Sequence, residues 1–296
     1  LRDVGQNHLL QMLALVTMDH PESFDPDTIR RRRADTMSKI KILTPKEIKE
    51  NTSRAQYEGY REIMGVAPDS EVETYFKVTL NLDTPRWSGV PLTIESGKRM
   101  GEAQKEIVIT FKHPSPCLCP PDAVEHHKNE VIIRMEPTEE ILIEFWTKRP
   151  GLSMATEKKM FSFMLREQSG KHQYTEEYER LLLDCIRGDQ TLFVSTDEIA
   201  ASWNFIDPII RAWKRGVVPL GAYSKGSAPM AVAANLLEQG AREGKGEEPL
   251  RKEIGMIGFG IFLLSRLPLA AAEVIHTGGT KLPFLVARVK LADQLL

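Results

Sequence analysis

Three side chains in the first hundred residues could act together on a hydroxyl group. His8 could take the hydroxyl proton while hydride leaves the carbon, and the carboxylate of Asp3 could fix neighbouring hydroxyls. Lys98, in the segment SGKRM, could bind or polarise the substrate. These are the residue types that oxidation of a sugar alcohol requires, although a lone lysine such as Lys98 is more often an ordinary surface residue.

His8 also has a structural interpretation. Apolar residues recur at helical spacing around it and predict a helix with a broad apolar face, at Val4, Leu9, Met12, Leu13 and Val16. A histidine in such a helix is more often a core residue with a hydrogen-bond partner. Residues five apart in an α-helix lie about 140° apart around the axis, so Asp3 is not expected to orient the imidazole of His8.

The bulk composition is that of a globular protein of one large domain or two. The chain has 296 residues, of which 42% are hydrophobic and 27% charged, and its formal net charge is −2. This charge disfavours obligate binding to nucleic acid or to an acidic membrane. The one dense basic run, 30–33, is expected to form a solvated helix face beside Asp25, Asp27 and Asp35.

The sequence also indicates a compartment. Three cysteines cannot all pair with one another, which favours a reducing environment. We see neither a charged-then-apolar leader nor an apolar span of about 20 residues, so the expected location is cytoplasmic. The loop around residues 111–127 fits no standard zinc spacing, and no metal is expected at its histidines and cysteines, which are His113, Cys117, Cys119, His126 and His127.

Alternating polar and apolar residues predict strands that are joined by connections too short for crossover helices. We therefore expect an antiparallel sheet, with strands within 73–83, 106–112, 130–137, 141–148 and 158–165. Two helices should follow, one within 175–190 that stops at Gly188 and one within 197–214 that is capped by Asp197. Strands followed by helices indicate the α+β class.

Five segments occur in an order that resembles the C-terminal part of glucose-6-phosphate dehydrogenase. They are RDVGQNHLLQMLALVTMDHP, RAQYEGY, DSEVETYFKVTLNLDTPRWSGVPLTIESGKRM, VIIRMEPTEE and YERLLLDCIRGDQTLFVSTDEI. The resemblance implies a domain over 1–245 with a large, mainly antiparallel sheet, helices packed on one face, and subunit contact through the sheet. It also implies that His8 is the general base and that Asp3 and Lys98 bind glucose 6-phosphate. NADP would be bound mainly by an N-terminal nucleotide-binding domain.

The chain begins at Leu1, inside a helical pattern, so we interpret it as a fragment without that nucleotide-binding domain and expect it to be inactive alone. A non-catalytic assembly or regulatory module derived from the same domain is the alternative. Residues 246–296 are expected to form a linker and an unassigned tail. Within this tail, EIGMIGFGIFLL resembles the start of 6-phosphogluconate dehydrogenase, but Leu263 replaces the third small residue of a dinucleotide-binding turn.

The sequence departs from the family pattern at two substrate positions. The family commonly has a second lysine where this chain has Ala103, with Lys105 two residues further on. The usual glutamine of the RxQP segment is Glu136, whose carboxylate would repel a phosphorylated substrate if it faced the site. The alternative is that Glu136 points away from the substrate site.

Overall fold

The computed structural model describes residues 1–113, 119, 127–153, 155–164, 177–228, 232 and 284–293, the last of these by their backbone. Within these residues the strands form one nine-stranded sheet in the order β7-β6-β5-β4-β9-β3-β2-β1-β8. Neighbouring strands are antiparallel except for the parallel pairs β1/β8 and β3/β9. The strands are β1 (Thr52–Tyr57), β2 (Tyr75–Leu80), β3 (Leu92–Lys98), β4 (Lys105–Phe111), β5 (Glu130–Glu136), β6 (Glu140–Lys148), β7 (Thr156–Met164), β8 (Leu220–Tyr223) and β9 (Phe284–Asp293).

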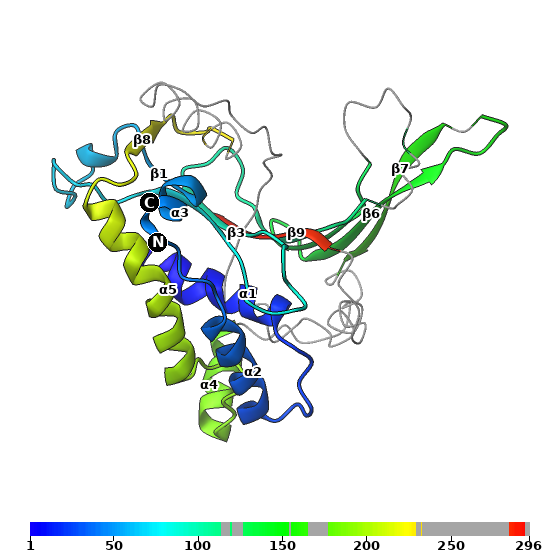
Figure 1. Ribbon diagram of the computed structural model, residues 1–296, viewed down its shortest axis with the longest axis horizontal. Coiled ribbons are helices and arrows are strands. Elements are labelled where there is room, and N and C mark those ends of the chain that lie inside the picture. The colour runs from blue at the N-terminus through cyan, green and yellow to red at the C-terminus, as the bar shows by residue number, and fades with distance from the viewer. Residues whose placement is uncertain are drawn as a thin grey trace.

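The main helices lie together on one side of this sheet, which Figure 1 shows for α1, α2, α4 and α5. The predicted α+β architecture is confirmed. The helices are the π-helix η1 (Val4–Leu9), α1 (Leu10–Thr17), α2 (Pro26–Ser38), α3 (Pro45–Asn51), the 3-10 turn η2 (Tyr60–Glu62), α4 (Glu177–Arg187) and α5 (Thr196–Lys214). In the described part of the chain, no helix combines the length and the apolar character that crossing a membrane would need.

The core lies between the sheet and these helices. Alternation along β2 buries Phe76, Val78 and Leu80 against the helix side, as the period-two pattern predicts. Helix residues such as Leu13 and Phe205 belong to the same cluster. The five predicted strands are present as β2, β4, β5, β6 and β7.

Alternation did not predict β1, β3 and β8, for physical reasons. The first six residues of β3 are all buried, so its two faces do not differ. β1 carries polar side chains that are buried because they form hydrogen bonds, and these interrupt the apolar pattern. Arg54 donates to the carbonyl of Val218, and Gln56 donates to the carbonyls of Ser70 and Val72. β8 has only four residues. Strand β9, near the end of the chain, lies between β3 and β4 and pairs with both. Residues 246–283 lie outside the described residues. The domain boundary near 245 stays a prediction.

Of two predicted helix ends, one is confirmed and the other was wrong. Helix α4 ends at Arg187, and Gly188 follows in the left-handed region with φ 71°, as expected for a stop. The prediction that Asp197 caps the next helix was wrong. Ser195 is the N-cap of α5, because its hydroxyl accepts from the backbone of Glu198 while the Glu198 carboxylate accepts from the backbone of Ser195.

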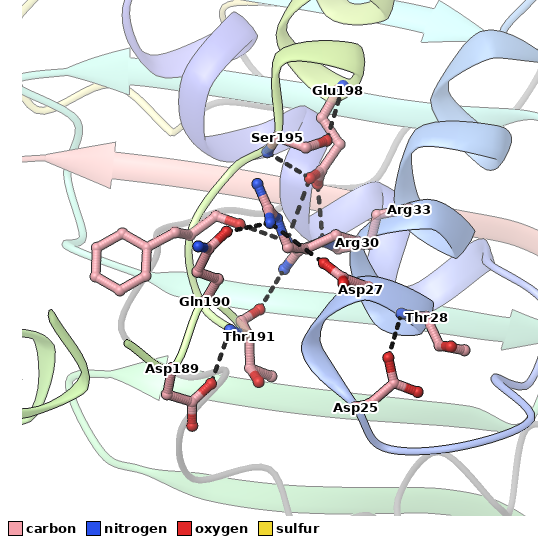
Figure 2. A network of polar contacts seen from close by, with 11 residues as sticks. Asp25, Asp27, Thr28, Arg30, Arg33, Asp189, Gln190, Thr191, Ser195 and Glu198 are labelled. Carbon is pink, nitrogen blue, oxygen red and sulfur yellow. Dashed lines mark hydrogen bonds and ion pairs between the residues drawn. The ribbon is translucent and has the colours of Figure 1, made fainter. Parts of the chain in front are cut away.

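The basic run is not a wholly solvated face, which corrects the expectation. Arg33 is buried between α2 and the start of α5 (Figure 2), where its Nε lies 2.7 Å from Oε1 of Glu198. Its guanidinium also donates to the carbonyls of Thr191 and Phe193, at 3.1 and 2.8 Å. Arg33 therefore joins two helices and the segment between α4 and α5.

Candidate active site

The first turn of the chain is a π-helix rather than the α-helix assumed from its spacing. Backbone bonds of the i→i+5 type run from the N–H of Gln6 to the carbonyl of Leu1 and from the N–H of Leu10 to the carbonyl of Gly5. Asp3 is the N-cap of this π-helix, and its carboxylate lies close enough to His8 for its charge to act on the imidazole. Single π-turns within helices occur frequently at functional sites.

His8 is half-buried, and its pKa is lowered from the ordinary value of 6.5. Burial is the main cause, because it disfavours the charged imidazolium. The carboxylate of Asp3 opposes this and raises the pKa of His8 by its charge. The lowered pKa favours the neutral imidazole near pH 7, which is the form that accepts a proton, and the exposed Asp3 carboxylate lies near it. Asp3 thus acts on the imidazole through its charge, and the expectation that it does not orient the ring stays a prediction.

The π-helix is positioned by the sheet below it and by α5. A Cβ on Gly5 would lie 3.2 Å from Cζ of Phe76, so glycine allows η1 to approach β2 closely. Nε2 of Gln6 donates to Oγ of Ser202 on α5 at 2.7 Å. Phe76 pairs with Ser96, two residues before Lys98, so η1 and Lys98 lie toward the same end of these strands.

Lys98 is exposed at the end of β3. By alternation it belongs to the same face as Leu92 and Ile94, which lie in the core under the helices. Its backbone N–H donates to the carbonyl of Thr74 at 2.8 Å, and its own carbonyl accepts from the hydroxyl of Tyr223 at 2.6 Å. Lys98 is thus placed on the side of the sheet that carries η1, although no direct contact with His8 is seen.

Both departures from the family pattern can be located. Glu136 is exposed at the end of β5 and forms an ion pair with Lys105 at the start of β4. Its carboxylate thus has a cationic partner from the neighbouring strand, which weakens the repulsion that a phosphorylated substrate would meet. Ala103 lies in the turn before β4 and offers no charge.

A cavity of about 240 Å³ lies beside this region but does not include the predicted residues. It is lined on one side by Gln6, Asn7 and Gln11 and on the other mainly by the start of α5. Neither His8 nor Lys98 lines it.

The described residues do not fit a dinucleotide. The parallel pairs β1/β8 and β3/β9 join distant parts of the chain, and neither contains the strand, glycine-rich turn and helix that hold a pyrophosphate. The segment 253–264, with its GFG, lies outside the described residues. No step of the chemistry is therefore assigned through NADP on this chain.

The histidine and cysteine loop is only partly described, because Cys117 and His126 lie outside the described residues. Nε2 of His113 lies 3.0 Å from Sγ of Cys119, and the ring of His127 stacks on Trp146. Among the described side chains, no group of three or more candidate ligands is placed to hold a metal ion.

Sequence reasoning missed Tyr223, whose hydroxyl holds the backbone of Lys98. It ends a four-residue strand 125 residues further along the chain, and no periodicity or motif marks it.

Comparison with known proteins identifies the family. The family model described as glucose-6-phosphate dehydrogenase, C-terminal domain, matches residues 1–244. The chain belongs to the glucose-6-phosphate dehydrogenase family. It is 34% identical to glucose-6-phosphate 1-dehydrogenase of Gluconobacter oxydans over 247 residues, which cover 80% of this chain and 50% of that protein. It is 36% identical to the enzyme of Buchnera aphidicola subsp. Schizaphis graminum over 228 residues, covering 72% and 46%.

Solved structures of glucose-6-phosphate dehydrogenases share the fold. One, in complex with its substrate glucose-6-phosphate, superposes with a TM-score of 0.69 at 28% identity and covers 81% of this chain and 50% of that one. The enzyme from Mycobacterium avium gives a TM-score of 0.64 at 29% identity, covering 80% and 49%. The chain spans about half the length of the relatives that it matches, and the resemblance deduced from its motifs is confirmed.

Proposed function

We propose that this chain is the substrate-binding and catalytic-base half of an NADP-dependent glucose-6-phosphate dehydrogenase. Its reaction is the oxidation of glucose 6-phosphate to 6-phosphogluconolactone, in the oxidative pentose phosphate pathway. The observation that carries the proposal is a half-buried His8 on the π-helix η1, whose imidazole feels the charge of Asp3 at the N-cap of that helix, in a chain of this family. A cytoplasmic location belongs to the same proposal, and a relative in Arabidopsis thaliana is named cytoplasmic.

Each of the three residues has a distinct task in this proposal. Neutral His8 accepts the proton of the anomeric hydroxyl, and the lowered pKa of its imidazole keeps the acceptor available at neutral pH. The nearby negative charge of Asp3 stabilises the imidazolium that forms, and its exposed oxygens can accept hydrogen bonds from sugar hydroxyls. Lys98 provides a cation for the phosphorylated sugar.

NADP would supply the hydride acceptor for this reaction. We place its binding site mainly on a nucleotide-binding domain outside this chain, because the described residues form no dinucleotide turn. The isolated chain should therefore bind glucose 6-phosphate without reducing NADP. Robust turnover by the isolated chain would contradict this part of the proposal.

The proposal is tested first by calorimetric titration of the chain with glucose 6-phosphate. Lys98→Ala should weaken binding about 10- to 100-fold, because hydrogen bonds to charged groups contribute about 1.5–3 kcal/mol. Lys112→Ala, at an exposed lysine on a different strand end, is the matched control and should bind as the wild type does. Failure of the unaltered chain to bind glucose 6-phosphate would refute the assignment.

The role of His8 is tested in a fusion of this chain behind the nucleotide-binding half of the Gluconobacter oxydans relative. His8→Asn should lower kcat by about 10²- to 10⁴-fold, the usual contribution of general-base catalysis, and leave KM within several-fold. The melting temperature of the same preparation separates this from a structural role. A destabilised variant with full turnover per folded molecule would show that His8 is a core residue.

We further propose that the protein forms a homo-oligomer through its sheet. β7 is an edge strand, and Met160 and Met164 are exposed on the face opposite the helices, beside the cluster of Val108, Ile132 and Leu142. Sedimentation of the chain should show self-association at micromolar concentration, weakened by Met160→Lys. A strictly monomeric wild type would refute this assembly.

A further inference from the structure

The loop that carries Lys98 has an unfavourable backbone conformation. Arg99, the next residue, has a φ of 54°, and it is the only described residue other than glycine with a positive φ. A long side chain in the left-handed region is strained, and such strain persists only where surrounding contacts hold it. The contacts that hold Arg99 therefore also determine where Lys98 lies.

Those contacts come mainly from one distant segment, 223–227. The hydroxyl of Tyr223 donates to the carbonyl of Lys98 at 2.6 Å, and the N–H of Gly226 donates to the carbonyl of Arg99 at 2.9 Å. In the opposite direction, the N–H of Gly101 donates to the carbonyl of Ser227 at 3.1 Å. We call these three hydrogen bonds the loop clamp.

Packing and hydrogen bonds hold Tyr223 in this position. Its side chain is buried, and its ring packs edge-on against Tyr57 and Tyr75 in a small core of its own. The hydroxyl also lies 3.2 Å from the carbonyl of Thr74, which itself accepts from the N–H of Lys98. Burial raises the pKa of Tyr223, so the phenol stays protonated and remains a donor at neutral pH.

The clamp also depends on close backbone approach. A Cβ on Gly101 would lie 2.6 Å from the carbonyl oxygen of Gly226, a backbone atom that cannot move aside independently. Gly226 itself has a φ of 83°, which a side chain would disfavour. The two segments thus meet through two glycines, and Tyr223 supplies the side-chain bond nearest to Lys98.

We propose that Tyr223 is a positioning residue for substrate binding, whose hydroxyl fixes the backbone of Lys98 and thereby the place of its ammonium group. This inference rests on the proposed role of Lys98. The hydroxyl, rather than the ring, carries the function, because Tyr57 and Tyr75 supply packing to the same cluster without contacting the Lys98 carbonyl. Substrate affinity should therefore depend on a group that never touches the substrate.

The test compares Tyr223→Phe with Tyr57→Phe in the full chain. Amide hydrogen exchange at Gly101 and Gly226 reports on the clamp, and titration with glucose 6-phosphate reports on affinity. Tyr223→Phe should speed exchange at both amides and weaken affinity about three- to tenfold, the range expected when the hydrogen bond to the Lys98 carbonyl is lost. Tyr57→Phe removes a hydroxyl from the same cluster and should change neither.

Gly101→Ala is the second variant, and it should weaken affinity similarly while Tyr223 stays intact. Unchanged exchange and affinity in Tyr223→Phe would overturn the inference, as would equal losses in Tyr57→Phe. Lys98→Ala tests the proposed function separately. If Lys98→Ala binds glucose 6-phosphate as the wild type does, the role of Lys98 is refuted and the positioning role falls with it. Weakened binding in Lys98→Ala with unaltered Tyr223→Phe refutes the positioning role alone.

Discussion

Replacing Arg33 by methionine should destabilise the protein more than any surface substitution on the same helix. The side chain of Arg33 is 1% exposed and that of Glu198 is 0% exposed. Arg33→Met leaves the Glu198 carboxylate buried without its cation, and it removes the donors of the Thr191 and Phe193 carbonyls. The perturbation thus acts on a buried charge pair and on the backbone of the segment that precedes α5 (Figure 2).

The expected magnitude follows from the burial of both partners. Removing one member of a buried ion pair costs about 3–5 kcal/mol, because the other charge stays desolvated and uncompensated. For a chain of this size, roughly 2–4 °C in Tm accompanies each kcal/mol, so the melting temperature should fall by about 6–20 °C. Glu198→Gln keeps an acceptor for the N–H of Ser195 and should cost less than Arg33→Met.

Urea unfolding followed by tryptophan fluorescence measures these changes. Arg31→Met is the matched control, because Arg31 is exposed on the same helix and its hydrogen bond is to Thr28, one turn away. This variant should stay within about 0.5 kcal/mol of wild type. The double variant Arg33→Met with Glu198→Leu should lose at least about 1 kcal/mol less than the sum of the single losses. An additive double variant, or a loss below about 1 kcal/mol for Arg33→Met, would refute the reasoning.

Three further predictions concern the π-turn. A pH titration of the His8 imidazole by NMR should give a pKa below 6.5, and Asp3→Asn should lower it further because the carboxylate favours the imidazolium; a rise in Asp3→Asn would contradict the electrostatic account. The pKa of His8 is lower in the folded chain than in the unfolded chain, so the unfolded chain binds the proton more readily. The free energy of unfolding should therefore decrease as the pH falls through about 6.5. His8→Asn should lack this contribution to the pH dependence. Gly5→Ala should cost about 1–3 kcal/mol in urea unfolding, since its Cβ would lie 2.7 Å from Cδ1 of Leu1 and 3.2 Å from Cζ of Phe76; a variant as stable as wild type would show that η1 can move away from β2.

The sequence predicted those parts of the fold in which a local pattern matches a local cause. Alternation along β2 is read directly from its residues, because one face of the strand meets the helices and the other does not. The stop at Gly188 is equally local, since only the backbone of one residue decides it. The family motifs also placed His8, Asp3 and Lys98 in one candidate site, whose roles stay predictions.

Features that depend on distant parts of the chain were not predictable in this way. The buried position of Arg33 requires Glu198, which is 165 residues away, and four successive arginines look alike in the sequence. The π-turn was not predicted either, because apolar residues three and four apart fit both an α-helix and a π-helix. The close approach of Gly5 to the sheet involves a distant strand, which the local pattern does not contain. Arg54 and Gln56 interrupt the alternation of β1 because their partners lie in other segments.

Buried polar side chains position the two halves of the candidate site independently. Arg33 holds α5 through Glu198, and Ser202 on α5 accepts the hydrogen bond from Gln6 of η1, two residues before His8. Lys98 is held instead by Tyr223, which belongs to a separate apolar cluster at the end of β8. Because the two networks share no residue, their perturbations should be separable. Arg33→Met should alter the surroundings of His8 without speeding amide exchange at Gly101, whereas Tyr223→Phe should do the reverse, and a common response would show that the sheet couples the base to the lysine.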